Sequence, residues 1–251
     1  EPVAFPCALH SYSIKKIEDR TGRGAMVTFE PRSFGSSFVF SKEGHMLCNY
    51  HQLDPVFSTP ESKGAIFLYH NPINGTSSTA RVLSYSKIND IALLKVNPDT
   101  RYDDIPILNT EPAYPEIVYS SVFANFGPFF EMSNKAMDTD GFDESLICSL
   151  SEVKAGFAGG PVLNEVEGVK QPLGFRYYLH EYRAKYDTGE VTDVRNGNSG
   201  SPVFTLNNQF CGITTSIYGP QENFQAHIVA FAGPTIVRKF LENYVNECKK
   251  A

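Results

Sequence analysis

A serine between glycines, in the stretch RNGNSGSPVF over residues 195–204, is the first candidate for a nucleophile. Gly197 and Gly200 let the backbone around Ser199 adopt conformations that other residues adopt only at a cost. The amides of Gly197 and Ser199 could then face a carbonyl oxygen that becomes negative, which is the role of an oxyanion hole. Taken alone, Gly-Asn-Ser-Gly is also an ordinary turn, so the interpretation needs a base and an acid elsewhere in the chain.

His51 and Asp90 are the candidates for that base and that acid. A serine hydroxyl needs a base to remove its proton, and a carboxylate that orients the base. Residues 35–51 are typical of a strand, a turn at Glu43-Gly44, a second strand and then His51. Asp90 directly precedes the apolar run 91–96, where a carboxylate needs a partner. Singly, each could be a surface histidine or a polar strand cap, but the order His, Asp, Ser indicates a catalytic triad.

These motifs resemble a trypsin-fold serine protease, with the HtrA/Deg branch as the most similar. The resemblance covers residues 35–245 and rests on residues 35–38 with 49–51, 90–96, 192–193 with 197–200, 212–217, and 230–234. It implies an all-β fold of two six-stranded antiparallel β-barrels with the active site between them. His51 and Asp90 would come from the first barrel and Ser199 from the second. It also implies a serine endopeptidase that forms an acyl-enzyme; no PDZ module is expected after the last helix.

The division of the chain follows from its turns and prolines. We expect an N-terminal domain over residues 1–110, with its barrel running from near residue 25 to 108, and a C-terminal domain over residues 111–251. Prolines between residues 105 and 115 suit a linker, and residues 117–127 are typical of a first strand of the second barrel. Apolar residues at 237, 240, 241, 244, 245 and 248 predict a closing α-helix, with Thr235 as its N-cap.

Residues 131–190 contain an alternative nucleophile motif. Asp90 and Ser199 are further apart than the family pattern suggests, so we expect an insertion in this window. Within it, residues 156–161 read GFAGGP, which resembles a nucleophile motif with Ala158 in place of serine. Ser199 is preferred because strand, turn, substrate strand, return strand and helix follow it in a compact run. Ala158 is either in a glycine-rich turn or at an inactivated nucleophile position.

Five residues are the candidates for the pocket that receives the substrate side chain before the scissile bond. Asp193 lies six residues before Ser199, where the resemblance to trypsin-like enzymes would select Arg or Lys. The pocket wall is expected from Thr215, Ser216 and Ile217, with Ala230 on the return strand. Because Ile217 would narrow the pocket, we expect a preference for small or medium aliphatic residues, with Asp193 turned away.

The overall composition restricts the partners. With 22 Lys and Arg against 28 Asp and Glu the net charge is −6, and no long apolar run is present, so neither nucleic-acid binding nor a membrane span is indicated. The five cysteines have no paired spacing, and Gln52 stands where secreted digestive relatives carry a cysteine. This favours a reducing, intracellular compartment over secretion, although Asn74-Gly75-Thr76 is also a glycosylation sequon; we interpret Asn74-Gly75 as a hairpin turn.

No metal or cofactor is expected, and the partners would be protein or peptide substrates. The alternatives to a protease are an inactive pseudoprotease that binds peptide along residues 214–217, and an esterase, which the order of the triad disfavours. Asn198 precedes the serine where digestive enzymes have an aspartate, so activation by N-terminal insertion is not expected. Loop ordering, a ligand or homo-oligomerisation would fit control better.

Overall fold

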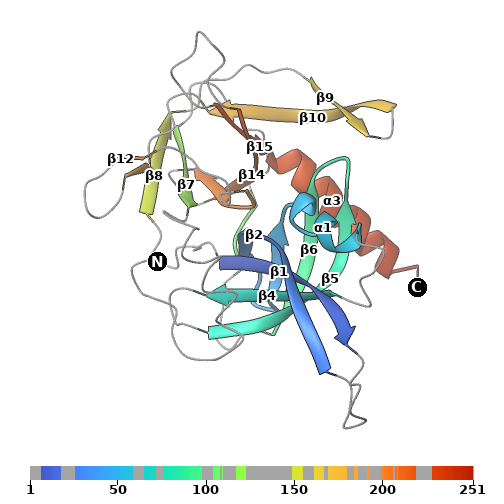
Figure 1. The fold of residues 1–251 in the computed structure, drawn as a ribbon. Helices are drawn as coiled ribbons and strands as arrows, with labels where there is room; N and C mark the ends of the chain where they lie inside the picture. Colours follow the sequence, from blue (N-terminus) through green and yellow to red (C-terminus); the bar gives the residue numbers. More distant parts are fainter. Residues whose placement is uncertain are drawn as a thin grey trace.

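A computed structural model describes residues 7–17, 26–58, 65–71, 76–97, 104–107, 109, 117–122, 149–154, 161–166, 169–179, 184–185, 191–192, 199–205, 207, 209–218 and 228–250. The chain is mostly β, with a closed barrel in its N-terminal part, a large sheet in its C-terminal part and a C-terminal helix (Figure 1). In the described part of the chain, no helix is both long and apolar enough to cross a membrane.

Six antiparallel strands close the barrel in the order β1-β2-β3-β6-β5-β4. They are β1 (Cys7–Ile17), β2 (Met26–Val39), β3 (His45–Cys48), β4 (Ala65–Asn71), β5 (Thr76–Ser86) and β6 (Ile91–Val96). The 3₁₀ turn η1 (Tyr50–Gln52) and the short helix α1 (Asp54–Phe57) follow β3. The predicted turn at Gly44 is confirmed, since this residue has φ +83° and its N–H donates to Ser41 (2.9 Å).

Strand β1 corrects the predicted start of the barrel near residue 25. Its alternation of apolar residues stops after Leu9, because Ser11 and Ser13 are also buried. Their hydroxyls are satisfied by β2: Ser11 shares a hydrogen bond with Ser33 (2.5 Å), and Ser13 accepts one from Arg32 (2.8 Å). Buried serines with such partners cost little, but they remove the period-two apolar signal on which the prediction depended.

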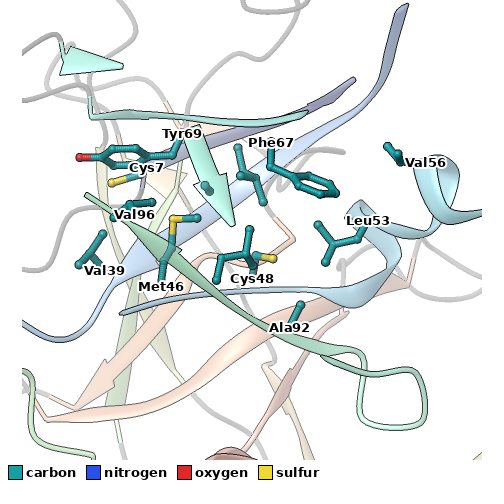
Figure 2. Close-up of a cluster of buried hydrophobic side chains, with 13 residues drawn as sticks. Cys7, Val39, Met46, Cys48, Leu53, Val56, Phe67, Tyr69, Ala92 and Val96 are labelled. Carbon is teal, nitrogen blue, oxygen red and sulfur yellow. The ribbon is translucent and has the colours of Figure 1, made fainter. Parts of the chain in front are cut away.

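Strand β6 is buried on both faces, which explains why it reads as a continuous apolar run. Ala92, Leu94 and Val96 belong to the barrel's interior cluster, which Figure 2 shows around Met46, Cys48 and Leu53. Ile91 and Leu93 face the other way, into a second cluster. Successive side chains of a strand point to opposite faces, so β6 contributes to two cores at once.

The C-terminal part forms a seven-stranded antiparallel sheet in the order β8-β7-β13-β14-β15-β10-β9. Its strands are β7 (Ile117–Val122), β8 (Ser149–Lys154), β9 (Pro161–Val166), β10 (Val169–Leu179), β13 (Pro202–Thr205), β14 (Phe210–Tyr218) and β15 (Ile228–Ala232). The pair β11 (Ala184–Lys185) and β12 (Val191–Thr192) forms a separate two-stranded sheet. The paired strands β9 and β10 lie in the window where an insertion is predicted, and closure of this sheet into a six-stranded barrel stays a prediction.

The second cluster joins the two parts of the molecule. Phe38, Leu47, Ile91 and Leu93 of the barrel pack with Phe204, Phe210, Ile213 and Ala232 of the large sheet, and helix α3 adds Ile236, Val237 and Phe240. The predicted linker also contributes, because Ile105 and Ile107 pack against this cluster and Pro106 accepts a hydrogen bond from Phe210 (3.0 Å). The barrel and the large sheet are therefore held together by a shared apolar core.

Helix α3 (Pro234–Cys248) confirms the predicted closing helix but begins earlier than expected. Its N-cap is Gly233 and not Thr235, because Pro234 is favoured at the first helical position by its fixed φ and missing N–H. Val245 and Cys248 were predicted on the packed face but are exposed. The buried residues of the helix, Pro234, Ile236, Val237 and Phe240, all lie in its first half.

Candidate active site

His51 and Asp90 form a doubly bonded pair at the edge of the barrel. The backbone N–H of His51 donates to Asp90 Oδ1 (2.9 Å), and His51 Nδ1 lies 2.8 Å from Asp90 Oδ2. The Asp90 side chain is 16% exposed and that of His51 is 48% exposed. With a proton on Nδ1, the imidazole donates to the carboxylate and presents Nε2 as a base, as general-base catalysis by a histidine requires.

The backbone at Asp90 is held in a conformation that few residues adopt. Asp90 has φ +54° and is the only described residue other than glycine with a positive φ. Aspartate tolerates this left-handed region better than most residues. The side chain of Asn49, fully buried, donates from Nδ2 to the carbonyl of Asp90 (2.9 Å). Since β3 and β6 are paired as far as Cys48 and Ala92, Asn49 extends that pairing to the turn that carries the acid.

Ser199 is attached to the barrel next to this pair. Its carbonyl oxygen accepts hydrogen bonds from the backbone N–H of Ser36 (2.9 Å) and from the side-chain amide of Gln52 (2.7 Å). Gln52 directly follows His51, so the backbone of Ser199 is bonded to the turn that carries His51. On the other side, Gly200 donates to the carbonyl of Thr214 in β14 (2.8 Å).

The predicted substrate pocket is described in part. Thr215 is buried and lies at an irregularity in the β14–β15 pairing, between Thr214 and Ser216. Ser216 is paired with Ala230, and Ile217 follows along the same register, so these predicted residues lie on adjacent strands. Gly197, Asp193 and Ala158 are outside the described residues.

Neighbouring groups of the described site offer no competing nucleophile or metal centre. Cys48 is fully buried beneath the pair; burial raises the pKa of its thiol well above the ordinary value, and the Asp90 carboxylate raises it further. A thiol of this kind stays protonated and unreactive. Among the described residues, no three or more His, Cys, Asp or Glu side chains lie where they could hold a metal ion, and four described cysteines are free thiols.

Sequence reasoning missed the residues that hold this site in place. Asn49 was part of a recognised motif, but nothing in the sequence indicated that its amide binds Asp90. Gln52 was noted as a replacement for cysteine, and not as a ligand of Ser199. A long-range contact between a glutamine side chain and a backbone carbonyl leaves no periodic signal in a sequence.

Comparison with known proteins gives one family and two relatives. A family model described as a trypsin-like peptidase domain matches residues 35–169, a range that includes His51 and Asp90 and ends before Ser199. Protease Do-like 1, a chloroplastic protein of Arabidopsis thaliana, is 24% identical over 198 residues, which cover 76% of this chain and 34% of that protein. A probable periplasmic serine endoprotease, DegP-like, of Hahella chejuensis is 26% identical over 220 residues, which cover 87% of this chain and 36% of that protein.

These matches agree with the resemblance found in the sequence. The chain spans about a third of the length of the two curated relatives. A match that covers 87% of the chain necessarily extends across Ser199, which the family model does not reach. The two relatives of this chain are proteases of the HtrA/DegP type. Because the family model covers more than half of the chain, the chain belongs to the trypsin-like peptidase domain family.

Proposed function

We propose that this chain is a serine endopeptidase that hydrolyses peptide bonds in protein substrates, with Ser199 as nucleophile. The observation that carries the proposal is the hydrogen bond from the side chain of Gln52 to the carbonyl of Ser199 (2.7 Å). It joins the backbone of Ser199 to the residue that follows His51, the one described histidine whose imidazole is bonded to a carboxylate. The domain boundary lies near residue 110 in this proposal, and the large sheet closes as a second barrel.

The proposed roles are those of a Ser-His-Asp triad, and the bonded pair of His51 and Asp90 supports them. His51 Nε2 accepts the proton of the Ser199 hydroxyl while the oxygen attacks the substrate carbonyl, and Asp90 stabilises the imidazolium that forms. The amides of Gly197 and Ser199 stabilise the oxyanion. His51 then donates the proton to the leaving amine, which leaves an acyl-enzyme on Ser199. Water activated by His51 hydrolyses this ester and regenerates the hydroxyl.

The substrate side chain before the scissile bond enters the pocket of Thr215, Ser216, Ile217 and Ala230. We expect cleavage after small or medium aliphatic residues, with Asp193 turned away from the pocket. A peptide library digested by the purified chain tests this specificity, with Ser199→Ala as the blank. Cleavage after Arg or Lys that disappears in Asp193→Ser would replace it with a trypsin-like pocket.

Reaction with a fluorophosphonate, followed by intact-protein mass spectrometry, tests the nucleophile. We expect one adduct on the wild-type chain, on the peptide that contains Ser199, and none on Ser199→Ala or His51→Ala. Ser37→Ala is the matched control: it removes another buried serine hydroxyl, one that donates to the carbonyl of Cys7 (3.1 Å), and should leave the reaction unchanged. A wild-type chain that folds and forms no adduct would exclude a serine peptidase.

A second function has one observation in its favour. The family model ends at residue 169, so its range contains Ala158 but not Ser199. If Ala158 occupies the nucleophile position, the chain is an inactive module that binds peptide by strand addition to β14. Among the described residues, β13 pairs with β14 as far as Ile213, whereas β15 pairs with it as far as Tyr218. Peptide binding by a wild-type chain that forms no adduct would support this alternative.

A further inference from the structure

We propose that Gln52 is a positioning residue for the nucleophile: its side chain holds the backbone of Ser199 against the barrel. The inference rests on the proposed function, because it takes Ser199 as the nucleophile. Gln52 belongs to the barrel, in the turn that follows β3, whereas Ser199 precedes β13 of the large sheet. No catalytic role in the triad mechanism calls for an amide at this position.

The amide group of Gln52 uses both of its hydrogens on backbone carbonyls. The side chain is 2% exposed, and Nε2 donates to Ser199 O (2.7 Å) and to Ser36 O (3.1 Å). Two acceptors fix the orientation of the amide, since rotating it by half a turn would place its oxygen against both carbonyls. Gln52 is thus a specific double donor between the two parts of the molecule.

The peptide unit after the nucleophile is held at both polar atoms. Ser199 contributes the carbonyl that Gln52 and Ser36 bind, and Gly200 contributes the N–H that donates to Thr214 (2.8 Å). Because these two atoms belong to one planar peptide group, binding both of them restricts the rotation of that plane. The Cα of Ser199 is attached to the same plane, so the direction in which its side chain leaves the backbone is restricted as well.

Two glycines provide the space that this contact requires. A Cβ at Gly35 would lie 2.5 Å from Cδ of Gln52, and a Cβ at Gly200 would lie 2.7 Å from Nε2. Gly200 also has φ +87°, a left-handed conformation that favours glycine. The backbone of Gln52 is held too, since its carbonyl accepts from the Ser33 hydroxyl. The amide is therefore enclosed by the backbone of β2 at Gly35 and by the backbone at Gly200.

The contact is not explained by packing alone. The Oε1 atom of Gln52 is buried without a hydrogen-bond partner, which opposes folding because a buried carbonyl loses its bonds to water. An apolar side chain of similar size would avoid the cost of burying Oε1. However, it would not make the two hydrogen bonds that Nε2 donates. The glutamine is therefore better suited to fixing Ser199 than to stabilising the fold.

Gln52→Leu and Gln52→Glu test the inference, with Ser37→Ala as the control for a lost buried bond on β2. We measure kcat and KM on a peptide found in the library digest, the fluorophosphonate rate constant per folded molecule, and the thermal midpoint. Gln52→Leu should lower kcat and the labelling rate by about 10- to 100-fold, with KM within about threefold, because a small displacement of a reacting group has effects of this size. Ser37→Ala should keep the wild-type kcat, KM and labelling rate, while its thermal midpoint falls because a buried hydrogen bond is lost.

Gln52→Glu gives a readout that a structural role would not move. When ionised, the new carboxylate faces two carbonyl oxygens and repels them, whereas its protonated form can donate one hydrogen bond; because burial favours the protonated form, the labelling rates are compared from about pH 5 to about pH 9. The ratio of the variant's labelling rate to that of wild type should therefore rise as the pH falls. Rates per folded molecule that match wild type in both variants, or a ratio that stays flat with pH, would overturn the inference while the proposed function stands. A wild-type chain without any adduct would overturn both.

Discussion

The carboxylate of Asp90 determines which nitrogen of His51 carries the proton, and Asp90→Asn tests this directly. Oδ1 accepts the backbone N–H of His51 (2.9 Å), and Oδ2 faces Nδ1 (2.8 Å). A backbone N–H can only donate, so the amide oxygen of the variant must take the place of Oδ1. Its NH₂ group then faces Nδ1, which has to act as an acceptor. The imidazole proton is forced onto Nε2, the atom that must accept the proton of the nucleophile.

The expected loss is large although the fold should be kept. Asparagine tolerates a positive φ as aspartate does, so the backbone at φ +54° is retained. The same tautomer error in a Ser-His-Asp triad costs about 10⁴ in kcat, which corresponds to about 5 kcal/mol of transition-state stabilisation. We therefore expect the fluorophosphonate rate constant of Asp90→Asn to fall by about that factor, with a thermal midpoint near that of wild type.

Asp104→Asn is the matched control for this experiment. Asp104 also accepts a backbone N–H, from Lys42 (3.1 Å), and faces the cationic side chain of that residue (3.6 Å), but it lies away from the site. Its removal should leave the rate constant unchanged. If folded Asp90→Asn reacts within about tenfold of wild type at neutral pH, the tautomer argument is refuted.

Three further predictions concern the turn, the pH dependence of stability and the choice of nucleophile. Gly200→Ala should lower the free energy of unfolding, measured in urea titrations, by about 2–3 kcal/mol. The left-handed φ of Gly200 disfavours alanine, and the new Cβ would overlap the carbonyl oxygen of Ser36. A loss below about 1 kcal/mol would contradict this prediction. Burial, and to a lesser extent the nearby Lys95, lowers the pKa of His45. The unfolded chain therefore binds a proton at a pH where the folded chain does not, and the free energy of unfolding should fall as the pH drops below about 6.5. His45→Gln should reduce the difference between melting temperatures at pH about 7.5 and about 5.5, and an unchanged difference would refute the assignment. Ala158→Ser should leave activity unchanged, whereas activity of this variant that survives Ser199→Ala would move the nucleophile to residue 158.

Local patterns were enough to predict several strands of the fold and its closing helix. Strand β3, its turn at Gly44, strand β6 and the run from β13 to α3 all have the period or the turn residues that sequence reasoning uses. The patterns also predicted that Asp90 is the carboxylate that orients His51. The structure brings the two side chains into contact. These features are predictable because each depends on residues close together in the chain.

What could not be predicted depends on contacts between distant segments. Strand β1 buries serines that are satisfied only by β2, so its pattern is polar where its surroundings are not. The unbroken apolar run of β6 predicts a buried strand, but not that Ile91 and Leu93 belong to a different core from their neighbours. The role of Gln52 depends on Ser199, 147 positions away in the chain.

This separation along the chain sets the order in which the parts of the active site can form. His51 and Asp90 are 39 positions apart and lie in one barrel, whereas Gln52 meets Ser199 across 147 positions. Because closing a longer loop costs more entropy and domains made first fold first, the base and its carboxylate can be in place while the segment of Ser199 is still being synthesised. For the proposed peptidase, this means that a nascent chain has no complete nucleophile site until the segment from Ser199 to Thr214 has docked on the barrel.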